Sequence, residues 1–184
     1  MNTTQIIDKT VKIMLLGDMA VGKTTLCDIL LQKEFNYIYN PTYGVDFYTV
    51  NYKTHKMYIW DPAGEYQFRS LINGFIYKTD IVIIMFDANK VDAYDNIIYW
   101  RNRVHNYAGP QIQIMLVGNK MDLPENADIE KIKNYADTHK ILLYLTSIKT
   151  CINMNELLDI IVNLFPQVTH SIVKKSNYSY CTII

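Results

Sequence analysis

The pattern of hydrophobic and polar positions along the chain predicts strands that alternate with helices. Short apolar runs predict six strands, at residues 10–16, 46–52, 56–60, 81–87, 112–118 and 141–146. Longer segments with apolar residues three or four positions apart predict five helices, at residues 22–33, 67–78, 92–107, 127–138 and 153–165. This alternation is typical of an α/β fold.

The composition of the strands predicts how they pair. The runs at 81–87 and 112–118 are almost wholly apolar, which indicates parallel strands covered on both faces. The runs at 46–52 and 56–60 are separated by a few polar residues, which predicts a hairpin. We therefore expect an α/β fold whose six-stranded sheet is mostly parallel, with one antiparallel edge strand and five flanking helices.

Length and composition indicate one domain of 184 residues, at 10–166, with an N-terminal extension at 1–9 and a flexible polar tail at 167–184. The 18 Lys and Arg balance the 18 Asp and Glu, so nothing in the charge points to nucleic acid. The polar N-terminus is unlike a signal peptide, and the apolar runs are too short to span a bilayer. The three scattered cysteines argue against a disulfide framework or a zinc site, and we expect Cys27 and Cys151 to be small core residues.

The first chemical motif lies between the first predicted strand and helix. Residues 17–24, Gly-Asp-Met-Ala-Val-Gly-Lys-Thr, match the phosphate-binding pattern GxxxxGK[ST]. Backbone N–H groups and the helix dipole favour a phosphate there, Lys23 would reach the outer phosphates, and Thr24 would ligate Mg²⁺. The alternative is an ordinary glycine-containing turn.

Other motifs follow at later strand ends, where α/β sheets bind ligands. Asp61 could hold Mg²⁺ through water, and Gly64 could bring its N–H close to a terminal phosphate, although Asp-x-x-Gly is also a common turn. In the run Asn-Lys-Met-Asp at 119–122, the Asp122 carboxylate can accept two hydrogen bonds from guanine, a pair that adenine does not offer. Asn119 can serve the base edge, and the Lys120 stem can lie over the ring. The run Thr-Ser-Ile-Lys at 146–149 would close over the base.

In order and spacing, these motifs resemble those of Ras-superfamily small GTPases over about residues 10–165. The resemblance implies a switch that binds GTP or GDP with Mg²⁺ and hydrolyses GTP. It also implies that Phe35 stacks edge-on against guanine, Tyr39 covers the phosphates, and Thr42 contacts Mg²⁺ and the γ-phosphate. The expected catalytic residues are Lys23, Thr42, Gly64 and Glu65, and the metal residues are Thr24, Thr42 and Asp61. The expected nucleotide contacts are Asp18, Met19, Ala20, Val21, Gly22, Lys23, Thr24, Thr25, Phe35, Tyr39, Thr42, Gly64, Asn119, Lys120, Asp122, Ser147, Ile148 and Lys149.

Within that superfamily the chain looks most like Rab proteins. The run Tyr-Gly-Val-Asp-Phe at 43–47 resembles a Rab segment, and Phe47, Trp60 and Phe75 match the aromatic triad that Rab proteins present to effectors. Core packing is the alternative for three aromatics. The resemblance implies a monomeric trafficking switch that meets effectors, an exchange factor and an activating protein through its switch regions.

Two departures from the family pattern bear on hydrolysis. Glu65 replaces the glutamine that orients the attacking water, and its negative charge would lie near the γ-phosphate. Met19 stands where the family prefers a small residue. We expect slow hydrolysis, with a GTP-loaded binding module that hydrolyses little or nothing as the alternative. A P-loop kinase or ATPase is a third alternative, which the guanine-reading run disfavours.

The chain ends Cys-Thr-Ile-Ile, a loose match to the prenylation pattern with Cys181 as acceptor. Thr182 is not aliphatic, and Rab proteins more often carry two terminal cysteines, so an unmodified tail is the alternative. With a prenyl group, the protein is expected in the cytoplasm, peripherally on the cytoplasmic face of a membrane.

Overall fold

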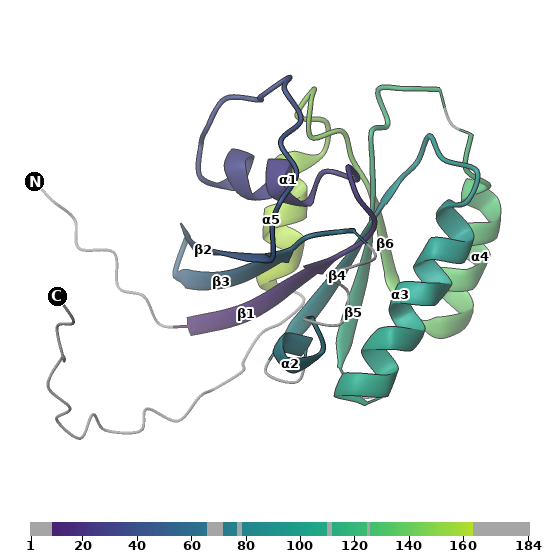
Figure 1. Ribbon diagram of the computed structural model, residues 1–184, viewed down its shortest axis with the longest axis horizontal. Coiled ribbons are helices and arrows are strands. Elements are labelled where there is room, and N and C mark those ends of the chain that lie inside the picture. Colours follow the sequence, from purple (N-terminus) through teal and green to yellow (C-terminus); the bar gives the residue numbers. More distant parts are fainter. Residues whose placement is uncertain (1–8, 66–71, 77–78, 110–111, 125, 164–184) are drawn as a thin grey trace, which may run out of the picture.

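A six-stranded sheet forms the centre of the computed structural model, with helices on both faces (Figure 1). The structure describes residues 9–65, 72–76, 79–109, 112–124 and 126–163. In chain order the elements are β1 (Lys9–Leu16), α1 (Lys23–Leu30), β2 (Val45–Tyr52), β3 (His55–Pro62), α2 (Asn73–Ile76), β4 (Ile81–Asp87), α3 (Ala93–Ala108), β5 (Gln113–Asn119), α4 (Ile129–His139), β6 (Leu142–Leu145) and α5 (Met154–Asn163).

The sheet has the order β2-β3-β1-β4-β5-β6. Among the strands that the structure describes, only β2 runs antiparallel to its neighbour. It forms the expected hairpin with β3, in which Phe47 lies opposite Trp60. The predicted fold class is therefore confirmed: a mostly parallel six-stranded sheet with one antiparallel edge strand.

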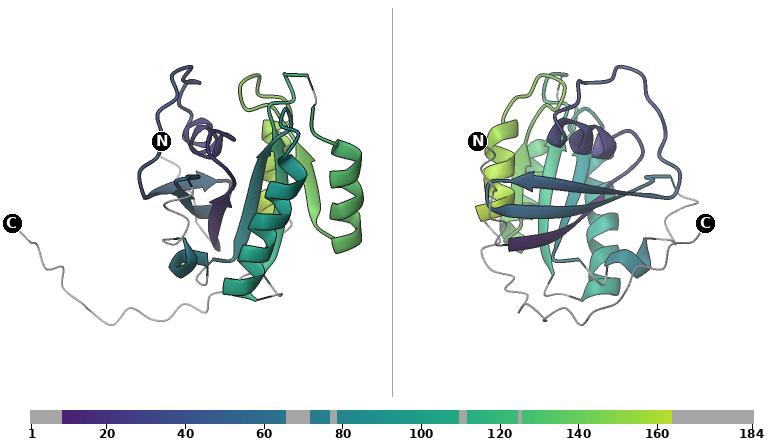
Figure 2. Two further views of the ribbon diagram at one scale, coloured as in Figure 1. Left: turned by 45° about the vertical axis from the view of Figure 1, so that its right-hand side comes forward. Right: turned by 90° about the vertical axis from the view of Figure 1, so that its left-hand side faces the viewer.

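Two apolar cores lie on opposite faces of the sheet, and β4 contributes to both. Ile81, Ile83 and Met85 belong to the core beneath α1 and α5. The alternate residues of β4 belong to the core beneath α2, α3 and α4. Every residue of β4 is buried, which explains why this strand is a continuous apolar run in the sequence. Figure 2 shows the two helical layers on either side of the sheet.

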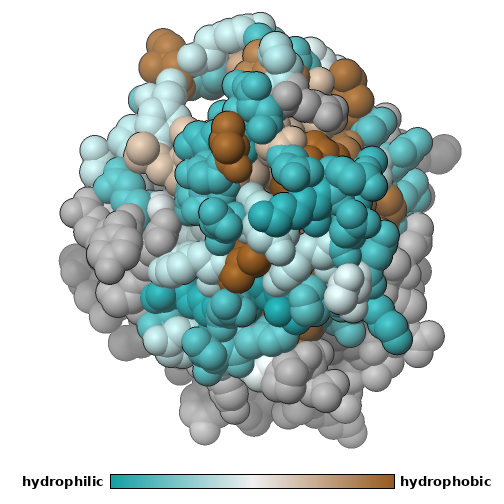
Figure 3. Space-filling view, turned by 90° about the vertical axis from the view of Figure 1, so that its right-hand side faces the viewer, coloured by the Kyte–Doolittle hydropathy of each residue, from teal (hydrophilic) through white to brown (hydrophobic). Residues whose placement is uncertain are grey.

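The helices are amphipathic, as their spacing predicts. In α3 the buried residues Ala93, Ile97, Trp100 and Val104 recur every three or four positions, so they form one stripe facing the sheet. The side of the molecule that carries α3 and α4 shows mainly hydrophilic residues to solvent (Figure 3). Within the described ranges, none of the helices combines the length and apolar character needed to cross a membrane.

Some details differ from the sequence prediction. Helix α1 ends at Leu30, before the predicted residue 33, since Gln32 takes a left-handed conformation with φ of 60°. Of the helix predicted at 67–78, residues 73–76 are helical, and 67–71 and 77–78 lie outside the described residues. Cys27 is buried as expected, but the prediction for Cys151 is wrong, because this residue is exposed in the turn before α5.

The fold brings the chemical motifs together. Because β1, β3, β4, β5 and β6 are parallel, their carboxyl ends lie at the same edge of the sheet. The loops that leave this edge carry the motif residues, and the site described next lies among them.

Candidate functional site

A cavity of about 460 Å³ opens at the carboxyl edge of the sheet, in the size range of small-molecule sites. Segments that lie far apart in the sequence contribute to it, from the loop before α1 to the loop after β6. The lining residues are Met19, Ala20, Gly22, Lys23, Thr24, Thr25, Asp28, Phe35, Asn36, Tyr37, Ile38, Tyr39, Asn40, Thr42, Gly64, Glu65, Asn119, Lys120, Asp122, Leu123, Ile148 and Lys149.

The loop between β1 and α1 depends on close backbone packing. Gly22, the N-cap of α1, has φ of 105°, and a Cβ there would lie 2.4 Å from the Asn119 side-chain nitrogen. A Cβ on Gly17 would lie 2.2 Å from the Met85 carbonyl oxygen. Both positions therefore require glycine. The first turn of α1 faces the cavity through Lys23, Thr24 and Thr25, so the positive end of the helix dipole is directed at its contents.

Lys23 is buried at the base of this loop. Its Nζ donates hydrogen bonds of 2.9 Å to the carbonyl oxygens of both Gly17 and Asp18. A buried ammonium group is costly unless polar groups surround it, and here the loop carbonyls meet that need. The result is a fixed positive charge in the wall of the cavity.

A cluster of oxygen atoms lies at the same end of the cavity. The Thr24 hydroxyl donates to Asp61 Oδ2 at 2.6 Å and lies 2.9 Å from the Thr42 hydroxyl. Asp61 is fully buried, and burial raises the pKa of its carboxyl to about 6 despite the opposing effects of Thr24 and Lys23. This carboxylate therefore lies in a place where its charge is poorly solvated.

The oxygen cluster fits a hard divalent cation. Asp61 Oδ1 is buried and has no hydrogen-bond partner among the residues that the structure describes, which leaves an acceptor oxygen without compensation. Two hydroxyl oxygens lie next to that carboxylate, and oxygen ligands of this kind are those that Mg²⁺ takes in proteins. The residues that the sequence predicted at the metal, namely Thr24, Thr42 and, through water, Asp61, are thus brought together.

At the opposite end of the cavity, Asp122 is oriented by its neighbours. The Ser147 hydroxyl donates to Asp122 Oδ1 at 2.6 Å, and Lys149 Nζ lies 4.0 Å from Oδ2. Ser147 is fully buried, so its hydroxyl fixes the plane of the carboxylate. Asp122 thereby presents an ordered acceptor pair to the cavity.

Asn119 connects the two loops that flank the cavity. Its Nδ2 donates to the Val21 carbonyl at 2.9 Å, and its Oδ1 accepts from the Ile148 N–H at 3.0 Å. The residue is buried, so both bonds are shielded from water. The sequence placed Asn119 at the edge of a base; the geometry adds a linking role that the pattern alone did not predict.

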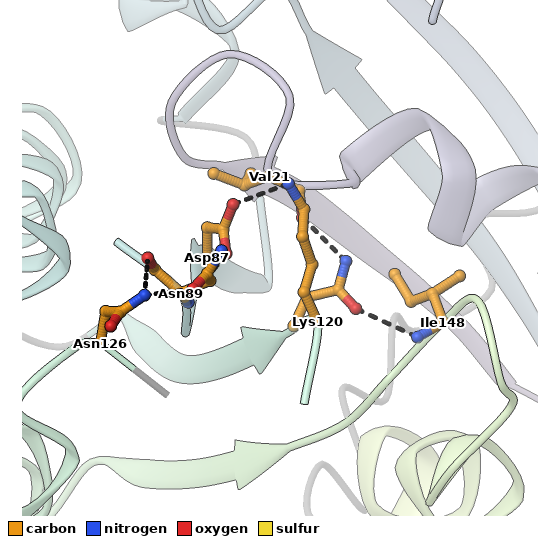
Figure 4. A network of polar contacts seen from close by, with 7 residues as sticks. Val21, Asp87, Asn89, Lys120, Asn126 and Ile148 are labelled. Carbon is orange, nitrogen blue, oxygen red and sulfur yellow. Dashed lines mark hydrogen bonds and ion pairs between the residues drawn. The ribbon is translucent and has the colours of Figure 1, made fainter. Parts of the chain in front are cut away.

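Lys120 is held by a partner that the motif search missed. Its Nζ forms an ion pair of 2.7 Å with Asp87, the buried last residue of β4 (Figure 4). Asn119 lies beside Asp87 in the sheet. With its charge bound there, the alkyl stem of Lys120 lines the cavity. The sequence did carry a signal for Asp87, namely a carboxylate closing an apolar strand one strand away from the Asn-Lys-Met-Asp run.

Aromatic residues form the wall between α1 and β2. The rings of Phe35 and Tyr37 meet edge to face, with centroids 5.1 Å apart, and both line the cavity with Tyr39. Partial burial, followed by the nearby Glu65 carboxylate, raises the pKa of Tyr39. Glu65 lines the same cavity as Tyr39.

Gly64 lies directly against the loop before α1. A Cβ on Gly64 would be 2.5 Å from the Asp18 carbonyl carbon and from the Met19 nitrogen. Glu65 and Met19 both line the cavity beside this contact, and Met19 is 47% exposed. The two residues that depart from the family pattern are therefore in the same part of the site.

Three of the residues predicted to contact the nucleotide do not line the main cavity. Asp18 and Val21 border a separate small cavity next to α3, and Ser147 acts through Asp122. Six residues that line the main cavity were not predicted from the sequence, because they belong to no recognisable motif. They are Asp28, Asn36, Tyr37, Ile38, Asn40 and Leu123.

The aromatic triad is partly assembled on the surface. Phe47 is 53% exposed and packs against Trp60 across the β2–β3 hairpin, with ring centroids 5.3 Å apart. Phe75 is 40% exposed on α2. This exposure argues against core packing for the two phenylalanines.

Cys181, the predicted prenylation site, lies outside the described residues.

Comparisons with a family model and with known proteins agree on the family that this chain resembles. Residues 12–167 match the family model for the Ras family. Ras-related protein Rab-22A from Mus musculus is 33% identical over 155 residues, covering 81% of this chain and 80% of the relative, and the protein of that name from Homo sapiens matches equally. GTP-binding protein YPTM1 from Zea mays is 34% identical over 157 residues, covering 81% of this chain and 74% of the relative.

These matches span the sheet and the loops that form the cavity. They agree with the order of motifs in the sequence and decide against the kinase and ATPase alternative. The chain belongs to the Ras family, in which it is a Rab-like small GTPase that hydrolyses GTP to GDP and phosphate.

Proposed function

We propose that the cavity binds GTP and GDP, with the base at the Asp122 end and the phosphates at the Lys23 end, and that the chain is a nucleotide-controlled switch that recruits effectors in membrane trafficking. The observation that carries this proposal is the placement of two complementary groups in one cavity. An oriented carboxylate lies at one end, and a helix N-terminus with a buried ammonium and an oxygen cluster lies at the other.

Base selection follows from the chemistry of Asp122. An ionised carboxylate is an acceptor only, and guanine offers it a ring N–H and an exocyclic amine side by side. The Ser147 hydroxyl already fixes one oxygen of that carboxylate, so little side-chain freedom is lost on binding. Phe35 and the stem of Lys120 both line the cavity and would supply apolar surface to the base, Phe35 by an edge-on contact and Lys120 by lying over the ring.

Phosphate binding follows from the loop before α1. Backbone N–H groups, the dipole of α1 and the Lys23 ammonium all attract a polyphosphate at this end. Thr24, Thr42 and Asp61 would hold Mg²⁺, which supplies positive charge to the phosphate oxygens when bound. Lys23 stabilises negative charge on the outer phosphates, as the transition state of phosphoryl transfer requires.

The switch itself rests on Thr42 and Gly64. Both line the cavity at the phosphate end, in the segments that precede β2 and follow β3. A γ-phosphate would hold both segments, and its loss would release them, so that Phe47 and Trp60 on the adjoining hairpin report the bound nucleotide to effectors. Exchange and activating proteins would act on the same segments of a monomer.

Membrane attachment through a prenyl group on Cys181 completes the proposal, and its support is the sequence of the tail alone. One lipid chain gives marginal anchoring, and Lys174 and Lys175 would add some attraction to an anionic surface. The protein would then act on the cytoplasmic face of a membrane.

Slow hydrolysis is the part of the proposal that is specific to this chain. Glu65 cannot donate a hydrogen bond to the attacking water when it is ionised, and its charge repels the γ-phosphate. Met19 adds bulk beside Gly64. If both effects are large, the protein is a GTP-loaded binding module that hydrolyses little or no GTP.

Replacing Asp122 tests the base assignment. We expect Asp122→Ala to weaken GDP binding by about a hundredfold or more, because two hydrogen bonds to a charged group are lost. Weak binding of ATP should not change. Isothermal titration measures both, with Asp137→Ala, an exposed carboxylate in α4, as the matched control. Unchanged GDP affinity in Asp122→Ala would contradict the assignment.

The pH dependence of metal stabilisation tests Asp61. In the metal-free protein, burial holds the pKa of this carboxyl at about 6, above the value of the unfolded chain. Its contribution to stability is therefore full at low pH and is lost as pH rises through 6. We expect Mg²⁺ to raise the melting temperature of the GDP-bound protein more at pH 7.5 than at pH 5.

Asp61→Asn is the control for titration of the phosphate itself. In EDTA at pH 7.5 this variant should melt at or above the temperature of the wild type, because the poorly solvated carboxylate charge at position 61 has been removed. Its response to Mg²⁺ should be smaller and lose most of its pH dependence. An equal response to Mg²⁺ in both proteins would remove Asp61 from the metal site.

Single-turnover hydrolysis tests the roles of Glu65 and Met19. We expect Glu65→Gln combined with Met19→Ser to speed γ-phosphate release by more than about threefold, a barrier change above roughly 0.7 kcal/mol. Glu130→Gln makes the same chemical change on an exposed position of α4 and should leave the rate as it is. A double variant within threefold of the wild type would show that neither residue slows the reaction.

A further inference from the structure

Helix α3 reaches the nucleotide loop, the segment between β1 and α1, through a partly buried hydrogen bond. Trp100 is 1% exposed, and its indole Nε1–H donates to Asp18 Oδ1 at 3.0 Å. A buried indole N–H needs an acceptor, and a carboxylate is a strong one. The Asp18 side chain is thus directed at α3 and away from the main cavity, although Asp18 lies inside the phosphate-binding motif.

The backbone of Asp18 lies at the contact between two other parts of the site. Its carbonyl oxygen accepts a hydrogen bond of 2.9 Å from Lys23 Nζ. Its carbonyl carbon and the following nitrogen of Met19 lie where a Cβ on Gly64 would clash, at 2.5 Å. One peptide unit, between Asp18 and Met19, therefore meets both the phosphate-binding lysine and the glycine after β3.

The same helix also contacts the segment beyond Gly64. Arg103, one turn after Trp100, donates through Nη2 to Asn73 Oδ1 of α2 at 2.8 Å and through Nη1 to the Tyr99 hydroxyl at 3.1 Å. Helix α3 is thereby attached to the nucleotide loop at one point and to α2 at another. Its own position is fixed by its apolar stripe against the sheet.

We propose that Trp100 is a positioning residue of the nucleotide site: by holding the Asp18 carboxylate, it fixes the Asp18–Met19 peptide in the geometry that Lys23 and Gly64 require. This inference rests on the proposed function, because it concerns how firmly the loop holds a nucleotide. Loss of the hydrogen bond would let the peptide rotate. The carbonyl that binds Lys23 would then move, and Gly64 would pack less closely against the peptide. Bound nucleotide would then leave faster.

The test measures release of a fluorescent GDP from the full chain with Mg²⁺ present. Trp100→Phe keeps an aromatic ring in the core and removes the donor, and Asp18→Leu removes the acceptor from the other side at similar volume. Each should speed release by about tenfold, equivalent to about 1.4 kcal/mol. The double variant should release no faster than either single one, because both changes break the same bond.

Two further variants separate positioning from stability. Asp18→Asn retains a side-chain oxygen that can accept from the indole, so release should stay within about threefold of the wild type. Val104→Ala removes buried volume from the same face of α3 without touching the loop. It should lower the melting temperature and leave release within about twofold of the wild type, since the hydrogen bond between Trp100 and Asp18 is kept.

The inference is overturned if Trp100→Phe and Asp18→Leu release GDP at the wild-type rate, if their effects multiply, or if Val104→Ala speeds release as much as they do. Asp18→Leu changes a partly exposed loop residue, so it tests the bond even if the core variant does not fold. In each of these outcomes the wild type still binds GDP. A wild type that binds no GDP would instead contradict the proposed function.

Discussion

The buried amide of Asn119 joins the two ends of the cavity, and the rest of the site depends on it. Its donor holds the Val21 carbonyl in the loop before α1, and its acceptor holds the Ile148 N–H in the loop after β6. Gly22 is forced to be glycine because that same amide lies where its Cβ would be. A ligand that spans the cavity therefore meets ends whose separation is fixed before binding, which lowers the entropic cost of binding.

This arrangement explains how one sheet edge can carry two kinds of recognition. Asp122 is oriented by Ser147 and Lys120 by Asp87, so the base end is rigid. At the other end, Asp61 keeps a buried oxygen that has no hydrogen-bond partner among the described residues, a cost that the proposed cation would relieve. Under the proposed function, this difference would place affinity at the base end and sensitivity to the phosphates at the other end, as a nucleotide-dependent switch requires.

The sequence predicted the strands and the motif positions well, because both follow from local patterns. The apolar run at 81–87 matches β4 residue for residue, and the predicted metal residues Thr24, Thr42 and Asp61 do come together. The sequence did not predict which side chains hold the other motif residues in place. The bonds of Trp100 to Asp18 and of Lys120 to Asp87 join positions 82 and 33 residues apart, and only the folded sheet shows that they meet. The misplaced Cys151 has a related cause, since an apolar neighbourhood in the sequence does not show where a helix begins.

The nucleotide that co-purifies with the full chain tests the central claim most directly. The account predicts close to one guanine nucleotide per chain by chromatography of the denatured protein, with bound GTP turning into GDP slowly over time. It also predicts that excess ATP leaves this nucleotide in place. An adenine nucleotide in the site, or displacement by ATP as readily as by GTP, would contradict the reading of Asp122 and of the cavity built around Asn119.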